Sequence, residues 1–462
     1  MSDEAINVVN DAVETEMNTE KSVELNELSN ELNNEVDNEA VNENIVINKL
    51  LNYRSYVIIL IANFISRFGD SLDSIAYGWM VYQLTGSKIL LGTIFAINSL
   101  PNIIFGPFAG VIVDRHNKKN VILLVYASRG IIVSLTAFMF FIGILRPWHL
   151  FIFTFVNSTL ETLGAPVFIS LIPKILPKEL YLKGNSFSTS AYKFAELVGL
   201  GAAGAIIALL GISGAIFIDG GTFFIAAFII LFLKVKHEIN QEAEVSVKAY
   251  LKDLGEGFRF IRDSYIIRTT LILFAITNFC LAPINVLMPA YVEDILKNGA
   301  GVLSMLGVAL SVGIILGGLV IGFIGNKFNK NHFISLGLII FGINYCLLFI
   351  PGNLIPSGLF SNAVAIGIFF VFGLIIPMLT SPLTTNIMIN TDKNMLGRVG
   401  SFISVISCCA IPLGSAITGS VSEIFPMTSI FLIMGMIVAL VGIRMIFNRK
   451  FKKVADEVNL VT

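Results

Sequence analysis

Long apolar runs dominate this chain after residue 50. A helix needs about 20 predominantly apolar residues to cross a bilayer, where its backbone hydrogen bonds must be satisfied internally. Of the 462 residues, 55% are hydrophobic and only 14% are charged. The sequence therefore predicts an all-α membrane protein with twelve transmembrane helices. The expected spans are roughly 55–82, 88–113, 120–143, 148–172, 185–210, 213–234, 267–292, 301–325, 332–351, 358–381, 400–420 and 427–447.

The first 50 residues have a different composition. Of the chain's 32 acidic and 31 basic residues, this segment holds 13 and 2, together with 11 asparagines and no aromatic residue. Such a segment cannot bury enough apolar surface to offset its ordering entropy, so we expect residues 1–50 to form a disordered acidic cytoplasmic tail. It has no basic start followed by an apolar core, so a signal peptide is not predicted. A spacer and a partner-binding segment both fit this composition.

Basic residues concentrate in alternate loops, and this pattern predicts the topology. One set of loops has only Lys88, Arg146 and Lys297, whereas the other set holds most of the remaining lysines and arginines. Cytoplasmic loops carry the excess of Lys and Arg. We therefore expect a multi-pass protein of the cell (plasma) membrane with both termini in the cytoplasm, ending in a basic tail at 449–462.

The longest internal connection, residues 235–265, divides the spans into two sets of six. It separates an expected N-terminal bundle at 51–234 from a C-terminal bundle at 266–448. Tyr250, Leu254, Phe258 and Ile261 recur in it at helical spacing, with basic residues on the other faces. This pattern is typical of an amphipathic helix lying on the cytoplasmic leaflet.

A motif after the second span recurs after the eighth. The stretch GPFAGVIVDRHNKKN begins at Gly106, and a degenerate copy, GLVIGFIGNKFNKNH, follows 212 residues later. Gly110 aligns with Gly322, Asp114 with Asn326, and Arg115 with Lys327. Other short pairs recur at an offset of 215, so the pattern indicates two parallel six-helix repeats.

These residues resemble the signature of the major facilitator superfamily. Stretches such as SRFGDSLDSIAYGWMVYQLTGS, FIDGGTFF and LGRVGSFIS resemble the drug and siderophore exporter branch, which includes macrolide efflux proteins and enterobactin exporters. The resemblance covers nearly all of the chain after residue 50. It implies two pseudo-symmetric six-helix bundles, alternating access and no enzymatic activity.

The resemblance also implies a gate at the motif. In the family this carboxylate, here Asp114, docks against the N-terminus of span 11, near Gly397 to Ser401, where the positive end of the helix dipole attracts an anion. The contact would close the cytoplasmic side and break when the carrier turns inward. Simple anchoring by basic residues is the alternative. The expected gating residues are Gly110, Asp114, Arg115, Lys118, Lys119, Gly322, Asn326, Lys327 and Arg398.

Ionisable residues within the spans are candidates for proton coupling, since charges at membrane depth are costly and usually line a cavity. Asp70 and Glu161 should lie near the midplane, where burial disfavours a charged carboxylate. Arg67 or Arg129 would hold the deprotonated form. The alternative is that these are static pairs, such as Arg67–Asp70 and Lys193–Glu196. The coupling candidates are Asp70, Glu161, Glu196, Arg67 and Arg129, whereas Asp73 and Asp219 are assigned structural roles nearer the outer surface.

The C-terminal spans carry only neutral polar residues at comparable depth, so they are expected to offer a neutral wall to the substrate. Aromatic, Met and Asn walls suit large amphipathic molecules. The cavity candidates are Tyr77, Asn98, Asn157, Phe168, Asn278, Asn285, Met288, Met378 and Thr384.

Other kinds of site are not supported by the sequence. The four cysteines show no metal-ligand spacing, so neither a metal nor a cofactor is expected. No phosphate-binding GxxxxGK[ST] is present, and the GLGAAG at Gly199 lies within a span rather than at a strand–helix turn. The expected partners are a small-molecule substrate, protons and the lipid bilayer, with no nucleic acid, and the chain is expected to be a monomer. Proton-driven efflux is the leading functional hypothesis; uptake of a nutrient or metabolite, and a non-transporting receptor or scaffold, are the alternatives.

Overall fold

The computed structural model describes residues 50–235, 255–256, 258–324, 330–391 and 395–448. Within these ranges the chain is almost entirely helical. The long helices are α2 (Arg54–Thr85), α3 (Lys88–Asp114), α4 (Lys118–Phe141), α5 (Pro147–Ile175), α6 (Tyr181–Leu231), α8 (Tyr265–Ala290), α9 (Ala300–Ile324), α10 (Lys330–Leu347), α11 (Leu359–Ile389), α12 (Leu396–Ile424) and α13 (Met427–Ile446). Two elements are short. The 3₁₀ turn η1 (Lys178–Leu180) precedes α6, and the π-helical η2 (Tyr291–Ile295) follows α8.

The helix α6 contains two of the expected spans. It runs for 51 residues, and Gly211 interrupts it with φ 72° and ψ 176°. A side chain there would meet the left-handed backbone penalty that glycine avoids. The chain therefore reverses at Gly211 without a loop. Counting α6 twice, the described chain has twelve long helical segments at the positions of the twelve predicted spans. Nine of its described helices are long and apolar enough to cross a membrane.

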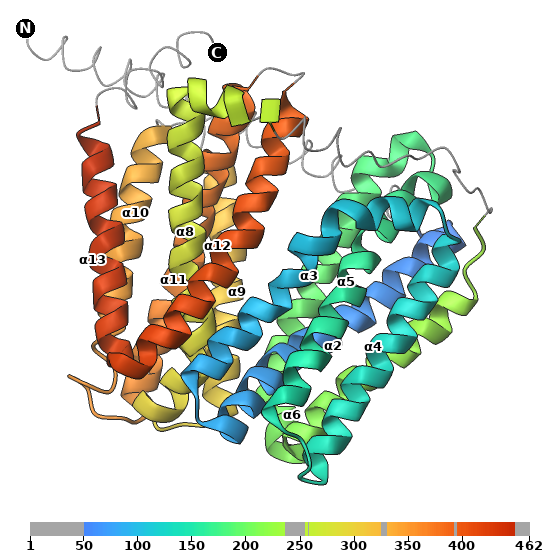
Figure 1. Ribbon diagram of the computed structural model, residues 1–462, viewed down its shortest axis with the longest axis horizontal. Helices are drawn as coiled ribbons and strands as arrows, with labels where there is room; N and C mark the ends of the chain where they lie inside the picture. The colour runs from blue at the N-terminus through green and yellow to red at the C-terminus, as the bar shows by residue number, and fades with distance from the viewer. Residues whose placement is uncertain (1–49, 236–254, 257, 325–329, 392–394, 449–462) are drawn as a thin grey trace, which may run out of the picture.

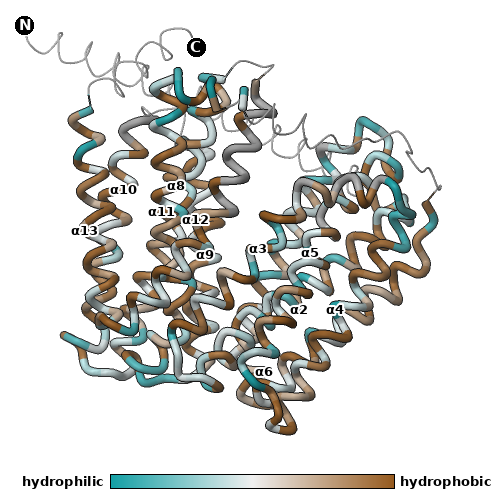
Figure 2. Tube along the Cα trace, viewed as in Figure 1, coloured by the Kyte–Doolittle hydropathy of each residue, from teal (hydrophilic) through white to brown (hydrophobic). Residues whose placement is uncertain are grey.

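The helices form two bundles whose packing repeats (Figure 1). In the first, α2 packs on α6, α3 on α5, and α4 on α6; in the second, the equivalent helices α8 and α12, α9 and α11, and α10 and α13 pack together. The pairings agree with the predicted duplication. Apolar residues line most of each helix, and hydrophilic residues gather at the turns (Figure 2), as expected for segments surrounded by lipid.

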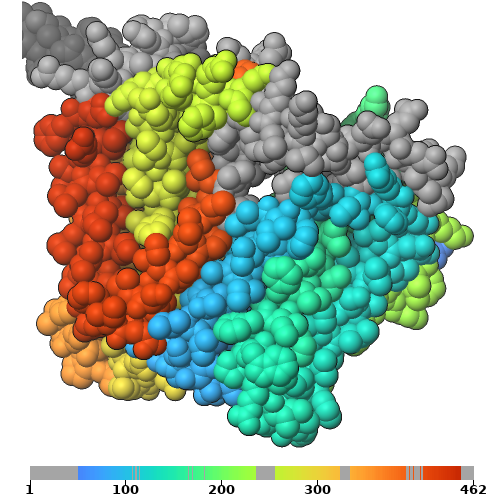
Figure 3. All heavy atoms as spheres, viewed as in Figure 1, coloured from blue at the N-terminus to red at the C-terminus, as the bar shows by residue number. Residues whose placement is uncertain are grey.

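The bundles converge at one end of the molecule. We call this the far end; it holds the α2–α3 and α12–α13 turns, and the near end holds the start of α2 and the end of α13. A Cβ built on Gly92 of α3 would lie 2.9 Å from the Cα of Gly419 in α12, and one on Gly204 of α6 would lie 2.7 Å from the Cα of Gly301 in α9. Both contacts lie in the far half, and α3 and α12 diverge toward the near end (Figure 3). The structure is therefore closed at the far end.

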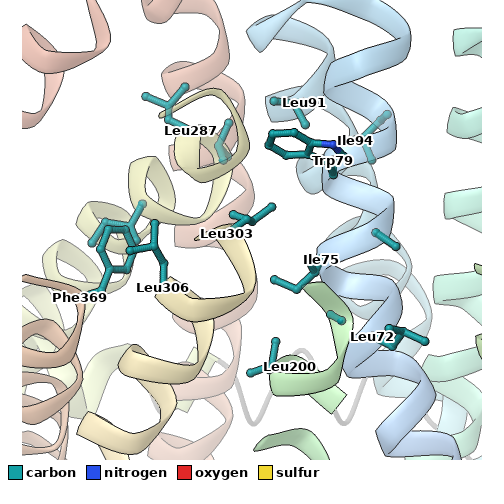
Figure 4. Packing of buried hydrophobic residues seen from close by; sticks show 14 of the residues in the cluster. Leu72, Ile75, Trp79, Leu91, Ile94, Leu200, Leu287, Leu303, Leu306 and Phe369 are labelled. Atoms are coloured by element: carbon teal, nitrogen blue, oxygen red, sulfur yellow. The ribbon is translucent and has the colours of Figure 1, made fainter. Parts of the chain in front are cut away.

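Apolar side chains seal this interface. Leu303 of α9 faces α2 between the bundles, with Ile75 of α2 opposite it and Leu200 of α6 farther along the same interface (Figure 4). All three belong to one buried cluster that continues through both bundles. This continuous apolar packing closes the space between the two bundles on the far side.

Only part of the inter-bundle connection can be compared with the predicted amphipathic helix. Residues 258–263 are helical, with Phe258 exposed and Ile261 buried against Ile267. Tyr250 and Leu254 lie outside the described residues, as do both tails, although Leu50 itself packs against Tyr56.

Candidate functional site

A buried arginine lies at the centre of the N-terminal bundle. Arg129 projects from α4 and is 7% exposed. Its Nη2 donates to Asp70 Oδ1 of α2 at 2.9 Å, and its Nε donates to Asn157 Oδ1 of α5 at 3.0 Å. The guanidinium also lies 4.3 Å from the ring centroid of Phe223 in α6, within the range of a cation–π contact. Partners from three other membrane segments therefore hold this one side chain.

Two charged residues that are more exposed than Asp70 flank the Arg129–Asp70 pair. Arg67 Nη1 lies 3.9 Å from Asp70 Oδ2, and Glu161 Oε2 lies 4.0 Å from Arg129 Nη2. The side chains of Arg67 and Glu161 are 51% and 46% exposed, against 21% for Asp70. Asp70 therefore hydrogen-bonds to Arg129 rather than forming only the predicted pair with Arg67. Arg129 also has a second carboxylate close by.

Two further carboxylates belong to this centre, although their positions in the sequence predict structural roles nearer the outer surface. Asp219 of α6 is 1% exposed and accepts a hydrogen bond from Thr222 Oγ1 at 3.3 Å. It interacts electrostatically with Asp73, Asp70 and Arg129. Asp73 Oδ1 is buried without a hydrogen-bond partner. Asp73 follows Asp70 by three residues, a spacing that places both on one helix face.

Two cavities meet at this centre. One has a volume of about 890 Å³ and the other about 300 Å³. Both are lined by Arg67, Asp70, Asn98, Arg129 and Glu161. Asp73 and Tyr77 line the smaller cavity, which lies toward the far end, whereas Asn63 and Phe168 line the larger one. The charged centre thus separates a wide chamber from a narrow one.

The predicted cavity residues of the N-terminal bundle all lie at these cavities. Asn98 and Phe168 line them directly, and Tyr77 shares a hydrogen bond of 2.7 Å with Thr154 Oγ1. Asn157 lines the smaller cavity, but its side-chain oxygen accepts from Arg129. Its position therefore indicates a role in fixing the arginine as well as in shaping the wall.

The predicted residues of the C-terminal bundle do not line either cavity. Among the described residues of that bundle, only Ile411 lines the larger one. Asn278 and Thr384 bond to carbonyls one turn earlier in their own helices, and Asn285 is exposed. Met288 and Met378 are partly buried. With the bundles apart at the near end, this wall remains a prediction.

The Lys193–Glu196 pair lies outside both cavities. Lys193 Nζ donates to Glu196 Oε2 at 2.8 Å, with side chains 59% and 38% exposed. It is one of the two pairs that the sequence predicts as possible static ion pairs. Neither residue lines either of the two cavities.

The gating motif is only partly described. Asp114 ends α3, but its side chain and those of Arg398 and Ser401 lie outside the described residues, as do Asn326 and Lys327 entirely. Asn117 caps α4 by accepting from the Lys119 backbone N–H, and Lys119 Nζ donates to the Leu231 carbonyl at the end of α6. Lys118 is buried and Arg115 is exposed. Gly110 lies in α3 and Gly322 in α9. Lys119 thus joins the start of α4 to the end of α6. The predicted contact between Asp114 and the N-terminus of α12 stays a prediction.

The charged centre can exchange ion pairs. A buried guanidinium beside two carboxylates can move from one to the other when a proton neutralises the first, since an unpaired buried charge is costly. Among the described residues, no group of three or more His, Cys, Asp or Glu side chains is arranged so that it could hold a metal ion.

Comparisons with known proteins agree with the fold. The Major Facilitator Superfamily profile matches residues 59–414. Macrolide efflux protein A of Streptococcus pyogenes is 23% identical over 382 residues, covering 82% of this chain and 92% of that protein. Multidrug efflux pump Tap of Mycolicibacterium fortuitum is 22% identical, covering 86% and 96%. The crystal structure of nucleoside transporter NupG superimposes with a TM-score of 0.68 at 14% identity, covering 85% of this chain and 99% of that one.

Proposed function

Because the chain belongs to the Major Facilitator Superfamily, a family of membrane transporters rather than enzymes, we propose that it exports amphipathic small molecules in exchange for protons. The predicted fold and the predicted transporter class are confirmed by the family match. What we propose in addition is the kind of substrate, the direction of transport and the coupling ion. Relatives named as macrolide and multidrug efflux proteins support export over uptake.

The observation that carries the proposal is the shared arginine. Arg129 joins Asp70 at 2.9 Å and lies 4.0 Å from Glu161, and both carboxylates line the larger cavity. A chamber of about 890 Å³ is in the range of drug-sized sites. Protons and substrate would therefore meet at one centre.

The position of Arg129 between the two carboxylates explains how proton binding and substrate binding could exclude each other. When Asp70 takes up a proton, it no longer compensates the charge of Arg129, and the guanidinium moves to Glu161. Loss of the proton from Asp70 returns Arg129 and frees Glu161, whose half-exposed carboxylate then receives the polar or cationic part of a substrate. Each ligand favours the arrangement that expels the other.

The positive-inside rule places the near end in the cytoplasm. In that orientation the far-end closure corresponds to an inward-facing state that accepts substrate from the cytoplasm. Closure of the near end would bring Asp114 to the N-terminus of α12, where the helix dipole holds the carboxylate.

The proposal is tested by expressing the chain in bacteria that lack their own efflux pumps. We expect intracellular accumulation of a fluorescent dye and of a macrolide to fall relative to cells with an empty vector. A rise in accumulation would overturn export in favour of uptake. A phenotype without transport, lost on removing residues 1–49, would instead support the scaffold alternative.

A further inference from the structure

Neutral hydrogen-bonding side chains gather on one wall of the larger cavity. Five of them come from helices of the N-terminal bundle, α2, α4, α5 and α6: Asn63, Ser66, Tyr126, Ser158 and Tyr192. We call these five residues the hydroxyl–amide wall. Sites for drug-sized molecules are lined mainly by apolar side chains with a few polar groups. A wall of this composition therefore indicates a ligand with a polar, uncharged part.

Hydrogen bonds among its own members hold part of this wall in place. Tyr126 Oη donates to Asn63 Oδ1 at 3.0 Å. Ser66 Oγ lies 3.4 Å from Tyr126 Oη and donates to the Asn63 carbonyl at 3.2 Å. All three side chains are buried. Their positions are therefore fixed before a ligand arrives, which lowers the entropic cost of binding.

Two members of the wall retain unused hydrogen-bonding capacity. Ser158 is 3% exposed, and its Oγ has no hydrogen-bond partner among the described residues. Asn63 is 6% exposed, and its Nδ2 makes no hydrogen bond within the described chain, although the Tyr192 hydroxyl lies beside it. A buried polar atom without a partner is costly and uncommon. A ligand group that both donates and accepts hydrogen bonds would supply the missing partners.

An aromatic side chain borders the wall. Phe168 of α5 lines the same cavity, and its ring centroid lies 6.5 Å from that of Tyr126. A sugar ring carries hydroxyl groups around its edge and C–H groups on its faces. Its edge can therefore hydrogen-bond to hydroxyl and amide groups while one face packs on an aromatic ring. From the described part of the C-terminal bundle the cavity is lined by the apolar Ile411 of α12.

We propose that the hydroxyl–amide wall binds a glycosyl group of the substrate. The inference rests on the proposed function for treating this cavity as the substrate site, and it narrows the substrate class to amphipathic glycosides. Sugar hydroxyls bond to Ser158 Oγ and accept from Asn63 Nδ2, and one face of the sugar packs on Phe168. The apolar part of the substrate extends toward Ile411.

A matched pair of probes tests this on the purified full chain in lipid nanodiscs. Naphthyl β-glucoside and its permethylated derivative share the naphthyl group and the sugar ring, but the methyl ethers cannot donate hydrogen bonds. Equilibrium dialysis, with empty nanodiscs to correct for partition into lipid, measures both affinities. We expect the glucoside to bind about tenfold tighter, as for two hydrogen bonds of ordinary strength. Equal affinity, tighter binding of the permethylated probe, or no saturable binding of the glucoside overturns the proposal and leaves the wall as a hydrated vestibule only.

Substitutions show whether the difference comes from the wall. Ser158→Ala and Asn63→Ala should each weaken glucoside binding about fivefold and change the affinity for the permethylated probe less than about twofold. Ser158→Ala removes a hydroxyl that lacks a partner, so folding should be retained. Thr159→Ala is the matched control, because its hydroxyl bonds to the Phe155 carbonyl of its own helix and it lines neither cavity. It should leave both affinities unchanged. A preference for the glucoside that is the same in both wall variants would mean steric exclusion of the methyl groups, and would contradict the proposal.

These binding measurements need neither a pH gradient nor net transport. A chain that binds the glucoside as expected but does not lower dye or macrolide accumulation in cells would contradict only the proposed export. A chain that exports but binds both probes equally would contradict only the glycosyl site.

Discussion

Arg129 shows how a single buried residue can organise a site. Its side chain is satisfied by Asp70, Asn157 and the Phe223 ring, so the charge is compensated on several sides. A buried charge needs such partners because the desolvation penalty is large. The same arrangement allows Arg129 to change partner when Asp70 is protonated, because Glu161 lies 4.0 Å away.

Replacing Asp70 with its neutral isostere tests the coupling role. Asp70→Asn keeps the size of the side chain and an acceptor for Arg129, so expression and folding should be retained. Proton-driven transport should be abolished because position 70 can no longer exchange a proton. Transport in vesicles measures this, with the exposed Glu179→Gln as a control. Normal transport in Asp70→Asn would remove this residue from the coupling role.

The two arginines of the centre should differ in their effect on stability. Arg129→Gln leaves buried carboxylates without their cation and should lower the free energy of unfolding by about 3 kcal/mol. Arg67→Gln removes a half-exposed partner and should change it by less than about 0.5 kcal/mol. Thermal unfolding of the purified variants in detergent makes the comparison, and equal losses would contradict the assigned burial roles.

The sequence is enough to predict some of the residues of the Arg129 centre. Helical spacing is enough to place Arg67 and Asp70 together, and intramembrane charge is enough to single out Arg129 and Glu161. Asp219 could not be assigned in this way. Its place depends on the second half of α6 packing against Gly69 of α2, where a Cβ would lie 2.3 Å from Asp219 Oδ1.

Among the helices, close packing depends on paired glycines. In the C-terminal bundle a Cβ on Gly313 of α9 would lie 2.3 Å from the Phe370 carbonyl and 2.8 Å from the Gly373 Cα of α11. Small residues allow helices to approach in this way. The backbones, rather than side chains, are in contact here.

Gly313→Ala should therefore be costly although alanine is a better helix former. The added methyl group must push α9 and α11 apart, and we expect a loss of about 2 kcal/mol in unfolding free energy. Gly318→Ala in the same helix meets no atom within 4 Å and should be neutral or slightly stabilising. Unfolding of both variants in detergent tests this; equal stability of the two would refute the packing argument.

The end of α3 carries the proposed near-end gate. Asp114→Asn should slow turnover while affecting substrate binding less, since the carboxylate is expected to act only when the near end closes. Turnover in vesicles and equilibrium binding, measured on the same preparation, separate the two effects. Unchanged turnover would leave positive-inside anchoring as the role of the motif.

The spans themselves are predictable from hydropathy, because each must cross the same apolar thickness. What could not be predicted is how neighbouring spans join. The expected break between 210 and 213 is a single left-handed residue, Gly211, rather than a loop. That geometry depends on backbone freedom at one position and leaves no compositional signal in a run this apolar.

The whole molecule is two bundles in contact at one end. Their equivalent helix pairings agree with the sequence repeat, but the two halves carry different chemistry. Among the described residues, the buried charged side chains lie in the first half, and the buried residues of the second half are apolar or neutral. Sequence predicts this asymmetry from where ionisable residues fall. It does not predict which end is closed, because that depends on the balance of contacts between the bundles.

The central claim is that substrate leaves the cell as protons enter. The most direct test uses everted membrane vesicles, whose lumen corresponds to the outside, with the lumen made acidic and a labelled macrolide or dye supplied externally. We predict that substrate accumulates in the lumen, that a protonophore abolishes this accumulation, and that Asp70→Asn vesicles show none. Accumulation that requires an alkaline lumen, or that is unchanged without a pH gradient, would contradict proton-driven export.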